Sequence, residues 1–267
     1  MRARLWRCLA GLTVAGFLAG IAPSAMANQA QLSYVGYLAG APVLSLEANI
    51  TVLEGATPGD GAYFISADIA TLGNLALLYP FTQRLQANGA LKSGKASPSR
   101  YQSTMRILGR QESVILTYAP TGTVGIEAVP LTRQVQMARE QGYANGTIDP
   151  ASLIVAVANL FARAGSCTGQ YQLFDGARRY DLALSQGGYA DLTEMPNSYY
   201  ASSATECTAT PQLVAGFQQS ALNANLYPQS ARLWMAPAIA GFPTVPVRIL
   251  ARSAFGDMTL ELVKVTR

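Results

Sequence analysis

Alternation of apolar and polar residues with a period of two dominates this chain after its first 27 residues. In the segment 101–107, Tyr101, Met105 and Ile107 fall on one side of an extended chain. This pattern is typical of antiparallel strands that cover a core with one face. Strands are predicted between turn residues at 32–38, 43–52, 63–71, 83–91, 101–107, 113–118, 232–236, 245–251 and 258–265, with a hairpin over 171–184.

One segment has the opposite character, because 11 of its 14 residues, 151–164, are apolar around almost the whole helical circumference. Asp149 and Pro150 precede it as an N-cap and a first-turn proline. A helix of this length is too short to span a bilayer, so it is expected to be buried. Two shorter helices are expected at 72–79, stopped by Pro80, and at 131–142.

These elements together predict a fold that is mainly β with a few helices. A strongly curved antiparallel sheet, either a β-spiral or a half-barrel, would wrap around the buried helix 151–164. The chain shows no repeat of fixed period and no linker, so residues 28–267 are predicted to form a single β-rich domain.

The first 27 residues predict export. Three arginines lie within the first seven residues, an apolar run covers 9–22, and Ala25-Met26-Ala27 fits a cleavage site. The competing interpretation, an uncleaved membrane anchor, requires about 20 apolar residues, and this run is shorter. Residues 1–27 are therefore predicted to be a cleaved signal peptide, so the mature chain begins at Asn28 and is not a transmembrane protein.

Several function classes are disfavoured by composition. The 16 basic and 15 acidic residues of 28–267 give a net charge of +1, which provides no electrostatic footprint for nucleic acid. The absence of histidine excludes serine–histidine triads and histidine-ligated zinc. No phosphate-binding glycine motif is present, so no nucleotide is expected. The sequence predicts no cofactor, no metal and no catalytic residue, and hence a protein that is not an enzyme.

Cys167 and Cys207 are the two cysteines of the predicted mature chain, and an even pair in an exported protein is most simply a disulfide. The bond would close a loop of 41 residues, which contributes about 4 kcal/mol in the chain-entropy model. A redox-active pair is the alternative, but the two residues form no C-x-x-C motif.

Other polar and aromatic positions have a structural and a functional interpretation. The sequence Asp175-Gly176 with Arg178, Arg179 and Asp181 is interpreted as a hairpin turn with a solvated strand face. Arg248 either pairs with a carboxylate inside the spiral or faces solvent, and solvent is the prediction. Trp234 either lines a ligand groove or lies in the core, and the core is the more common place.

Three tyrosines, Tyr189, Tyr199 and Tyr200, lie close in sequence to Asp191 and Glu194. Aromatic residues beside two carboxylates are found in glycan hydrolases, but those enzymes need two carboxyl groups on either side of the scissile bond. Proximity in sequence does not provide that geometry. A carboxylate-based glycan hydrolase is therefore only the less favoured alternative.

Several short motifs occur in one order along the chain: Tyr34-x-x-Tyr37, Leu77-Leu78-Tyr79-Pro80-Phe81, Pro98-x-x-Tyr101, Asp149-Pro150-Ala151-Ser152-Leu153, Phe174-Asp175-Gly176-x-Arg178-Arg179-Tyr180, Leu233-Trp234-Met235 and Pro246-Val247-Arg248. In this order they resemble the exported bacterial family catalogued as domain of unknown function 3108. The resemblance implies a periplasmic protein with a spiral or half-barrel sheet, similar in architecture to lipoprotein carriers, and it implies no enzyme activity. The acidic residue that the family often has after the Leu-Trp strand is replaced here by Ala236-Pro237-Ala238.

Two functions remain open at this point. The first is a non-catalytic envelope protein that binds an unknown periplasmic partner or acts as a scaffold. The second is a carrier of a lipid or other hydrophobic ligand in an apolar cavity, in which helix 151–164 would be either a plug or a lid. A filled interior would favour the first function, and a cavity of several hundred Å³ would favour the second. The sequence does not identify ligand-binding residues.

Overall fold

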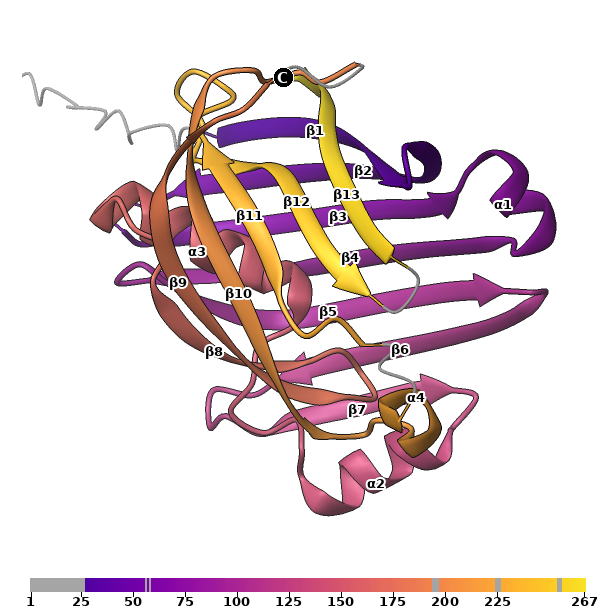
Figure 1. The fold of residues 1–267 in the computed structure, drawn as a ribbon. Helices are drawn as coiled ribbons and strands as arrows, with labels where there is room; N and C mark the ends of the chain where they lie inside the picture. The colour runs from indigo at the N-terminus through magenta and orange to yellow at the C-terminus, as the bar shows by residue number, and fades with distance from the viewer. Residues whose placement is uncertain (1–26, 56, 58, 194–196, 224–226, 254–255) are drawn as a thin grey trace, which may run out of the picture.

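A computed structural model describes residues 27–55, 57, 59–193, 197–223, 227–253 and 256–267. Within these residues the chain forms one sheet of thirteen strands (Figure 1). The strands are β1 Ala27–Leu38, β2 Ala41–Glu54, β3 Gly61–Thr71, β4 Phe81–Lys92, β5 Lys95–Ile107, β6 Arg110–Tyr118, β7 Val124–Val129, β8 Gly169–Phe174, β9 Arg179–Asp191, β10 Ser203–Ala215, β11 Ala231–Ala236, β12 Val245–Ser253 and β13 Gly256–Thr266.

The sheet is antiparallel throughout, and its order is β7-β6-β5-β4-β3-β2-β1-β13-β12-β11-β10-β9-β8. Strands β1 and β13 pair in the middle of the sheet, whereas β7 and β8 form its two edges. The sheet is not closed, and its second half arches over the first with a helix between them (Figure 1). The predicted curved antiparallel sheet around a helix is confirmed.

Four helices accompany the sheet in the described residues: α1 Gly73–Leu78, α2 Arg133–Gln141, α3 Pro150–Ala164 and α4 Gln219–Asn223. The predicted helices at 72–79, 131–142 and 151–164 correspond to α1, α2 and α3. Strands β7 and β10 had no counterpart among the predicted strands. The inward positions of β10 carry small residues such as Ala204 and Ala209, so its apolar alternation is weak.

Helix α3 is the helix around which the sheet wraps. Its N-cap residue Asp149 accepts a hydrogen bond from the backbone N–H of Ser152 at 2.8 Å, and the left-handed Gly165 ends it. Its first half is buried, including Val155 and Val157. Burial is less complete than predicted, because Ile154 is 37 % exposed and the last turn is exposed.

The two sides of α3 belong to two apolar clusters. Val155 packs in the larger cluster, which includes Ile50 of β2 and Leu91 of β4. Val157 packs in a smaller cluster with Leu184 of β9 and the two cysteines. The helix therefore joins the two halves of the curved sheet. No helix in the described part of the chain is long and apolar enough to cross a membrane.

Candidate functional site

An apolar cleft lies where α3 meets the first half of the sheet and the segment before β12. Its cavity volume is about 40 Å³. The cleft is lined by Ile50, Val52, Leu91, Ile154, Val155, Ala158, Asn159, Phe242, Pro243 and Val245. Small-molecule sites typically have volumes of about 300–1,000 Å³, and one water occupies about 30 Å³ in the liquid. The cleft is therefore too small for an acyl chain in this structure.

The segment 237–244, which connects β11 to β12, closes this cleft. It turns back so that Ile239 and Phe242 are both buried. The backbone N–H of Phe242 donates to the carbonyl oxygen of Ile239 at 3.1 Å, which fixes the turn. Phe242 thus occupies space that a hydrophobic ligand would need.

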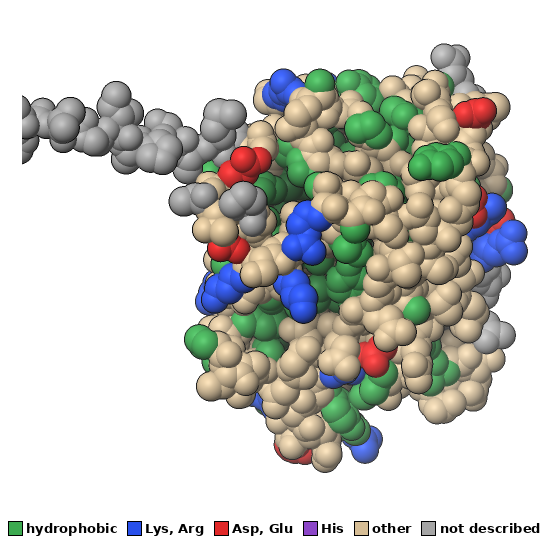
Figure 2. Space-filling view, turned by 90° about the vertical axis from the view of Figure 1, so that its left-hand side faces the viewer, with side chains coloured by type: hydrophobic (Ala, Val, Ile, Leu, Met, Phe, Trp, Pro, Cys, Tyr) green, Lys and Arg blue, Asp and Glu red, His purple; other side chains and the backbone are tan. Residues whose placement is uncertain are grey.

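Polar contacts fasten the C-terminal end of α3 to the turn between β4 and β5. Asn159 Nδ2 donates to the carbonyl oxygen of Gly94 at 2.6 Å, and Arg163 Nη1 donates to that of Ser93 at 2.5 Å. Lys92 and Lys95 are exposed on the same turn. Figure 2 views the molecule from the left-hand side of Figure 1 and shows hydrophobic side chains in a hollow bordered by Lys and Arg side chains. Lys92 and Lys95 therefore place basic side chains on the turn that holds the C-terminal end of α3.

The other end of α3 carries a buried carboxyl group. Asp149 is 0 % exposed, and its Oδ2 accepts from Ser152 Oγ at 2.6 Å. Tyr63 Oη in turn donates to Ser152 Oγ at 2.8 Å. Burial raises the pKa of Asp149 above its usual value, and the hydrogen bonds from Ser152 oppose that rise. Because this carboxyl group caps the helix and has no access to solvent, the geometry assigns it a structural role.

Three tyrosines surround this region from neighbouring strands. Burial raises the pKa values of Tyr63, Tyr101 and Tyr118, and the Asp149 carboxylate raises them further. Among the described residues, the Tyr118 hydroxyl is buried without a hydrogen-bond partner. These neutral phenols form part of the core. The sequence identified Asp149 as an N-cap but gave no indication that tyrosines would collect around it.

Arg248 corrects a prediction. Its side chain is only 12 % exposed and does not face solvent. Arg248 Nε donates to Glu261 Oε2 at 2.7 Å, and Nη2 donates to Oε1 at 3.1 Å. Glu261, on the neighbouring strand, is 0 % exposed and also accepts from Ser198 Oγ at 2.6 Å. The sequence did not reveal that Thr193 and Ser198, between β9 and β10, would contact this pair; Arg248 Nη2 also donates to the carbonyl oxygen of Thr193 at 3.1 Å.

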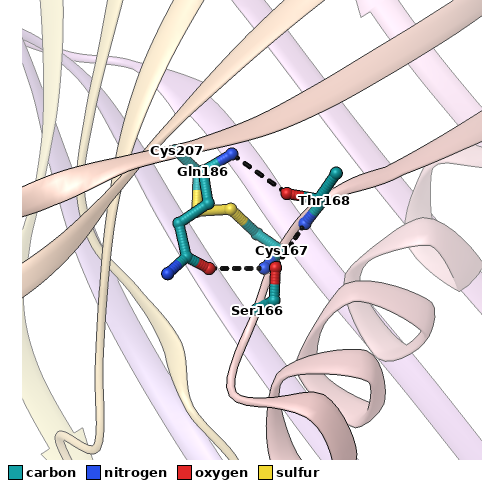
Figure 3. The surroundings of a disulfide bond; sticks show 5 residues. All are labelled: Ser166, Cys167, Thr168, Gln186 and Cys207. Carbon is teal, nitrogen blue, oxygen red and sulfur yellow. Dashed lines mark hydrogen bonds between the residues drawn. A yellow bond between two sulfur atoms is a disulfide. The ribbon is translucent and has the colours of Figure 1, made fainter.

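The predicted disulfide between Cys167 and Cys207 is confirmed (Figure 3). It joins the segment before β8 to β10, and both cysteines are buried. Gln186 Oε1 accepts from the backbone N–H of Cys167 at 3.3 Å, which ties β9 to the same point. Burial beside Val157 and Leu184 favours a structural bond over a redox-active pair.

The charged turn at 175–181 is a hairpin turn, as predicted. Asp175 Oδ1 accepts from the backbone N–H of Arg178 at 2.8 Å, and Gly176 has the positive φ of 110° that a side chain rarely adopts. Arg178 pairs with Asp175 at 2.7 Å and Arg179 with Asp181 at 3.1 Å. The predicted solvated strand face is wrong for Arg179, whose side chain is 14 % exposed and donates to the carbonyl oxygen of Tyr143 at 3.2 Å.

Most of the described residues of the hydrolase alternative lie on the surface. Tyr189 and Tyr199 are exposed, and Asp191 is exposed at the end of β9. Tyr200 Oη donates to the carbonyl oxygen of Ser203 at 2.8 Å. Glu194 lies outside the described residues, so the distance between the two carboxyl groups is not tested.

Trp234 is buried in the core, as predicted, and the Arg232 guanidinium lies 5.1 Å from the centre of its ring.

A depression of about 290 Å³ lies near Trp234, on the face of the sheet that points away from α3. It is lined by Thr208, Ser230, Arg232, Leu250 and Arg252. The sequence gave no signal for this depression, because its residues come from separate strands. No group of three potential metal ligands occurs in the described part of the chain.

Comparisons with known proteins found a distant similarity to a solved structure. No family model matches the chain, and no curated protein matches its sequence. A crystal structure described as a beta-barrel-like protein of domain of unknown function DUF1849 from Brucella abortus is similar, with 12 % identity and a TM-score of 0.49. The similarity covers 89 % of this chain and 95 % of that chain. The resemblance to domain of unknown function 3108 stays a prediction.

Proposed function

We propose that this protein is a non-catalytic protein of the periplasm that acts by binding a partner through its surface or by holding envelope components together. The observation that supports this proposal most is that the apolar cleft beside α3 measures only about 40 Å³, so the interior is nearly filled at this place. Side chains of α3 and of the segment 237–244 occupy the space inside the curved sheet. When side chains occupy the interior, the surface is the part of the protein that can bind a partner.

Two further observations fit this proposal. The disulfide between Cys167 and Cys207 suits an oxidising compartment outside the cytoplasm, as does the predicted signal peptide. The most buried carboxyl groups, Asp149 and Glu261, are each engaged by side chains of the protein itself. In the described chain, both are therefore held by internal hydrogen bonds, which fits a structural role.

The test is cross-linking in living cells with a photoreactive amino acid at single exposed positions. Positions 78 on α1 and 189 on β9 are exposed, and position 232 on β11, where the side chain is 43 % exposed, borders the depression. We expect one position to give a reproducible adduct with one partner while the other two do not. A glycan hydrolase activity that is lost when Asp191 or Glu194 is changed would contradict the proposal.

The carrier function is a second candidate, and the apolar cleft beside α3 is the observation in its favour. Displacing Phe242 would join the cleft to the space that this side chain now fills. Phe242→Ala is then expected to increase the amount of lipid that is extracted from the purified protein. If neither the wild-type protein nor this variant carries lipid in amounts near one molecule per chain, the carrier function fails.

A further inference from the structure

Helix α1 exposes apolar side chains to a degree that no packing within the described chain explains. None of its residues is buried, and Leu77 and Leu78 are 83 % and 80 % exposed. Tyr79, directly after the helix, is 44 % exposed. A helix of six residues is too short to be stable alone in water, so its neighbours must hold it in place.

The backbone around α1 is held by hydrogen bonds. Thr71 Oγ1 donates to the carbonyl oxygen of Tyr79 at 3.1 Å and accepts from the backbone N–H of Phe81 at 3.1 Å. The backbone N–H of Leu72 donates to the carbonyl oxygen of Val43 on β2 at 2.9 Å. The two leucines are therefore presented to solvent by an ordered turn.

A second apolar tip lies beside the first. The backbone N–H of Leu108, in the turn between β5 and β6, donates to the carbonyl oxygen of Pro80 at 3.1 Å. Leu108 is 57 % exposed. We call Leu77, Leu78, Tyr79 and Leu108 the apolar rim. Figure 1 places α1 and the β5–β6 turn at the right-hand end of the molecule, away from the C-terminal end of α3.

Two exposed arginines flank the tip at Leu108. The segment 72–80 contains no charged residue, whereas Arg106 and Arg110 stand on either side of Leu108. Arg106 Nη2 donates to Gln111 Oε1 at 2.9 Å, and the first acidic residue after this turn is Glu112. Aliphatic side chains and a tyrosine are suited to the interfacial region of a membrane, and nearby arginines are suited to the phosphates of anionic lipids.

We propose that the apolar rim docks on the surface of a bilayer that contains anionic phospholipid. Leu77, Leu78 and Leu108 would enter the boundary between headgroups and acyl chains, with Arg106 and Arg110 at the phosphates. The projecting turns favour a lipid surface over a protein groove, because a bilayer adapts to a convex tip. This inference rests on the proposed function, since it names the component of the envelope that the surface binds.

The experiment is co-sedimentation of the purified protein with vesicles of phosphatidylcholine and phosphatidylglycerol, and with vesicles of phosphatidylcholine alone. The variant L77S/L78S is expected to bind the anionic vesicles at least tenfold more weakly than the wild-type protein. The variant R106Q/R110Q is expected to lose the preference for anionic vesicles. The matched control Y189S/V214S removes exposed apolar side chains elsewhere and is expected to bind like the wild-type protein.

Because α1 has no buried residue, L77S/L78S should melt at the wild-type temperature, and circular dichroism checks this. Absence of vesicle binding by the wild-type protein would overturn the proposal, as would equal binding by L77S/L78S. A dimer in light scattering that L77S/L78S abolishes would also overturn it, since a second copy would then cover the apolar rim. If vesicle binding fails while cross-linking still identifies a partner, the proposed function stands and this inference falls.

Discussion

Replacing Arg248 by methionine tests the buried ion pair that joins β12 to β13 beside Ser198. The change removes two of the three hydrogen bonds that Glu261 accepts from side chains, at 2.7 and 3.1 Å, and leaves the one from Ser198. Glu261 is 0 % exposed, so its charge would stay buried without a counterion.

Breaking a buried pair by removing one partner costs about 3–5 kcal/mol. Arg248 is 12 % exposed, so some water reaches its end of the pair, and the lower value of about 3 kcal/mol is the better expectation. That is a large part of the roughly 5–15 kcal/mol by which domains are stable. The double variant R248M/E261M removes the unpaired charge and should recover most of the loss.

Urea unfolding followed by tryptophan fluorescence measures this effect directly. Trp234 is the only tryptophan in residues 28–267, and it lies opposite Arg248 in the pairing of β11 with β12. Arg84→Met serves as control, because Arg84 pairs with Asp68 in solvent and its loss should leave the unfolding midpoint unchanged. A loss below about 1 kcal/mol for R248M, or a double variant as unstable as the single one, would refute the reasoning.

Three other changes have defined outcomes. Burial raises the pKa of Asp149 in the folded protein. The carboxyl group therefore contributes most to stability below its usual pKa of about 3.9, and this contribution is lost as pH rises through the higher folded pKa. The unfolding free energy should then fall less between pH 4 and pH 7 in Asp149→Asn than in the wild-type protein. Val155→Asp should cost several kcal/mol in urea unfolding, whereas its half-exposed neighbour Ile154→Asp should cost far less, and equal losses would show that Val155 is not buried. Removing the disulfide as C167A/C207A should cost about 2–4 kcal/mol and lower the melting temperature by several degrees; an unchanged melting temperature would contradict its structural role.

The fold was largely predictable because its determinants are local. Alternation predicts most strands, Asp149 and Pro150 mark the start of α3, and Pro80 marks the end of α1. Strand β5 begins earlier than the predicted residue 101, because Pro98 lies beside a register shift that accommodates it opposite Gly89. A proline in a strand pattern usually argues against pairing, so the sequence alone indicated a later start.

The candidate sites were less predictable because they depend on contacts between distant segments. Arg248 donates to the carbonyl oxygen of Thr193, 55 residues away, and Glu261 accepts from Ser198, 63 residues away. The cleft beside α3 is narrow because Phe242 turns inward, and no periodicity encodes that turn. The apolar residues Leu77 and Leu78 were visible as a motif, but their exposure follows from where α1 sits at the end of the sheet.

Native mass spectrometry of the protein purified from its own envelope tests the central claim most directly. The filled interior predicts the mass of the polypeptide alone, with the Cys167–Cys207 disulfide intact and no bound lipid. The measurement should be repeated on L77S/L78S, so that lipid held at the apolar rim is distinguished from lipid held inside. A lipid adduct near one molecule per chain that persists in this variant would contradict the claim, because the ligand would then occupy the interior.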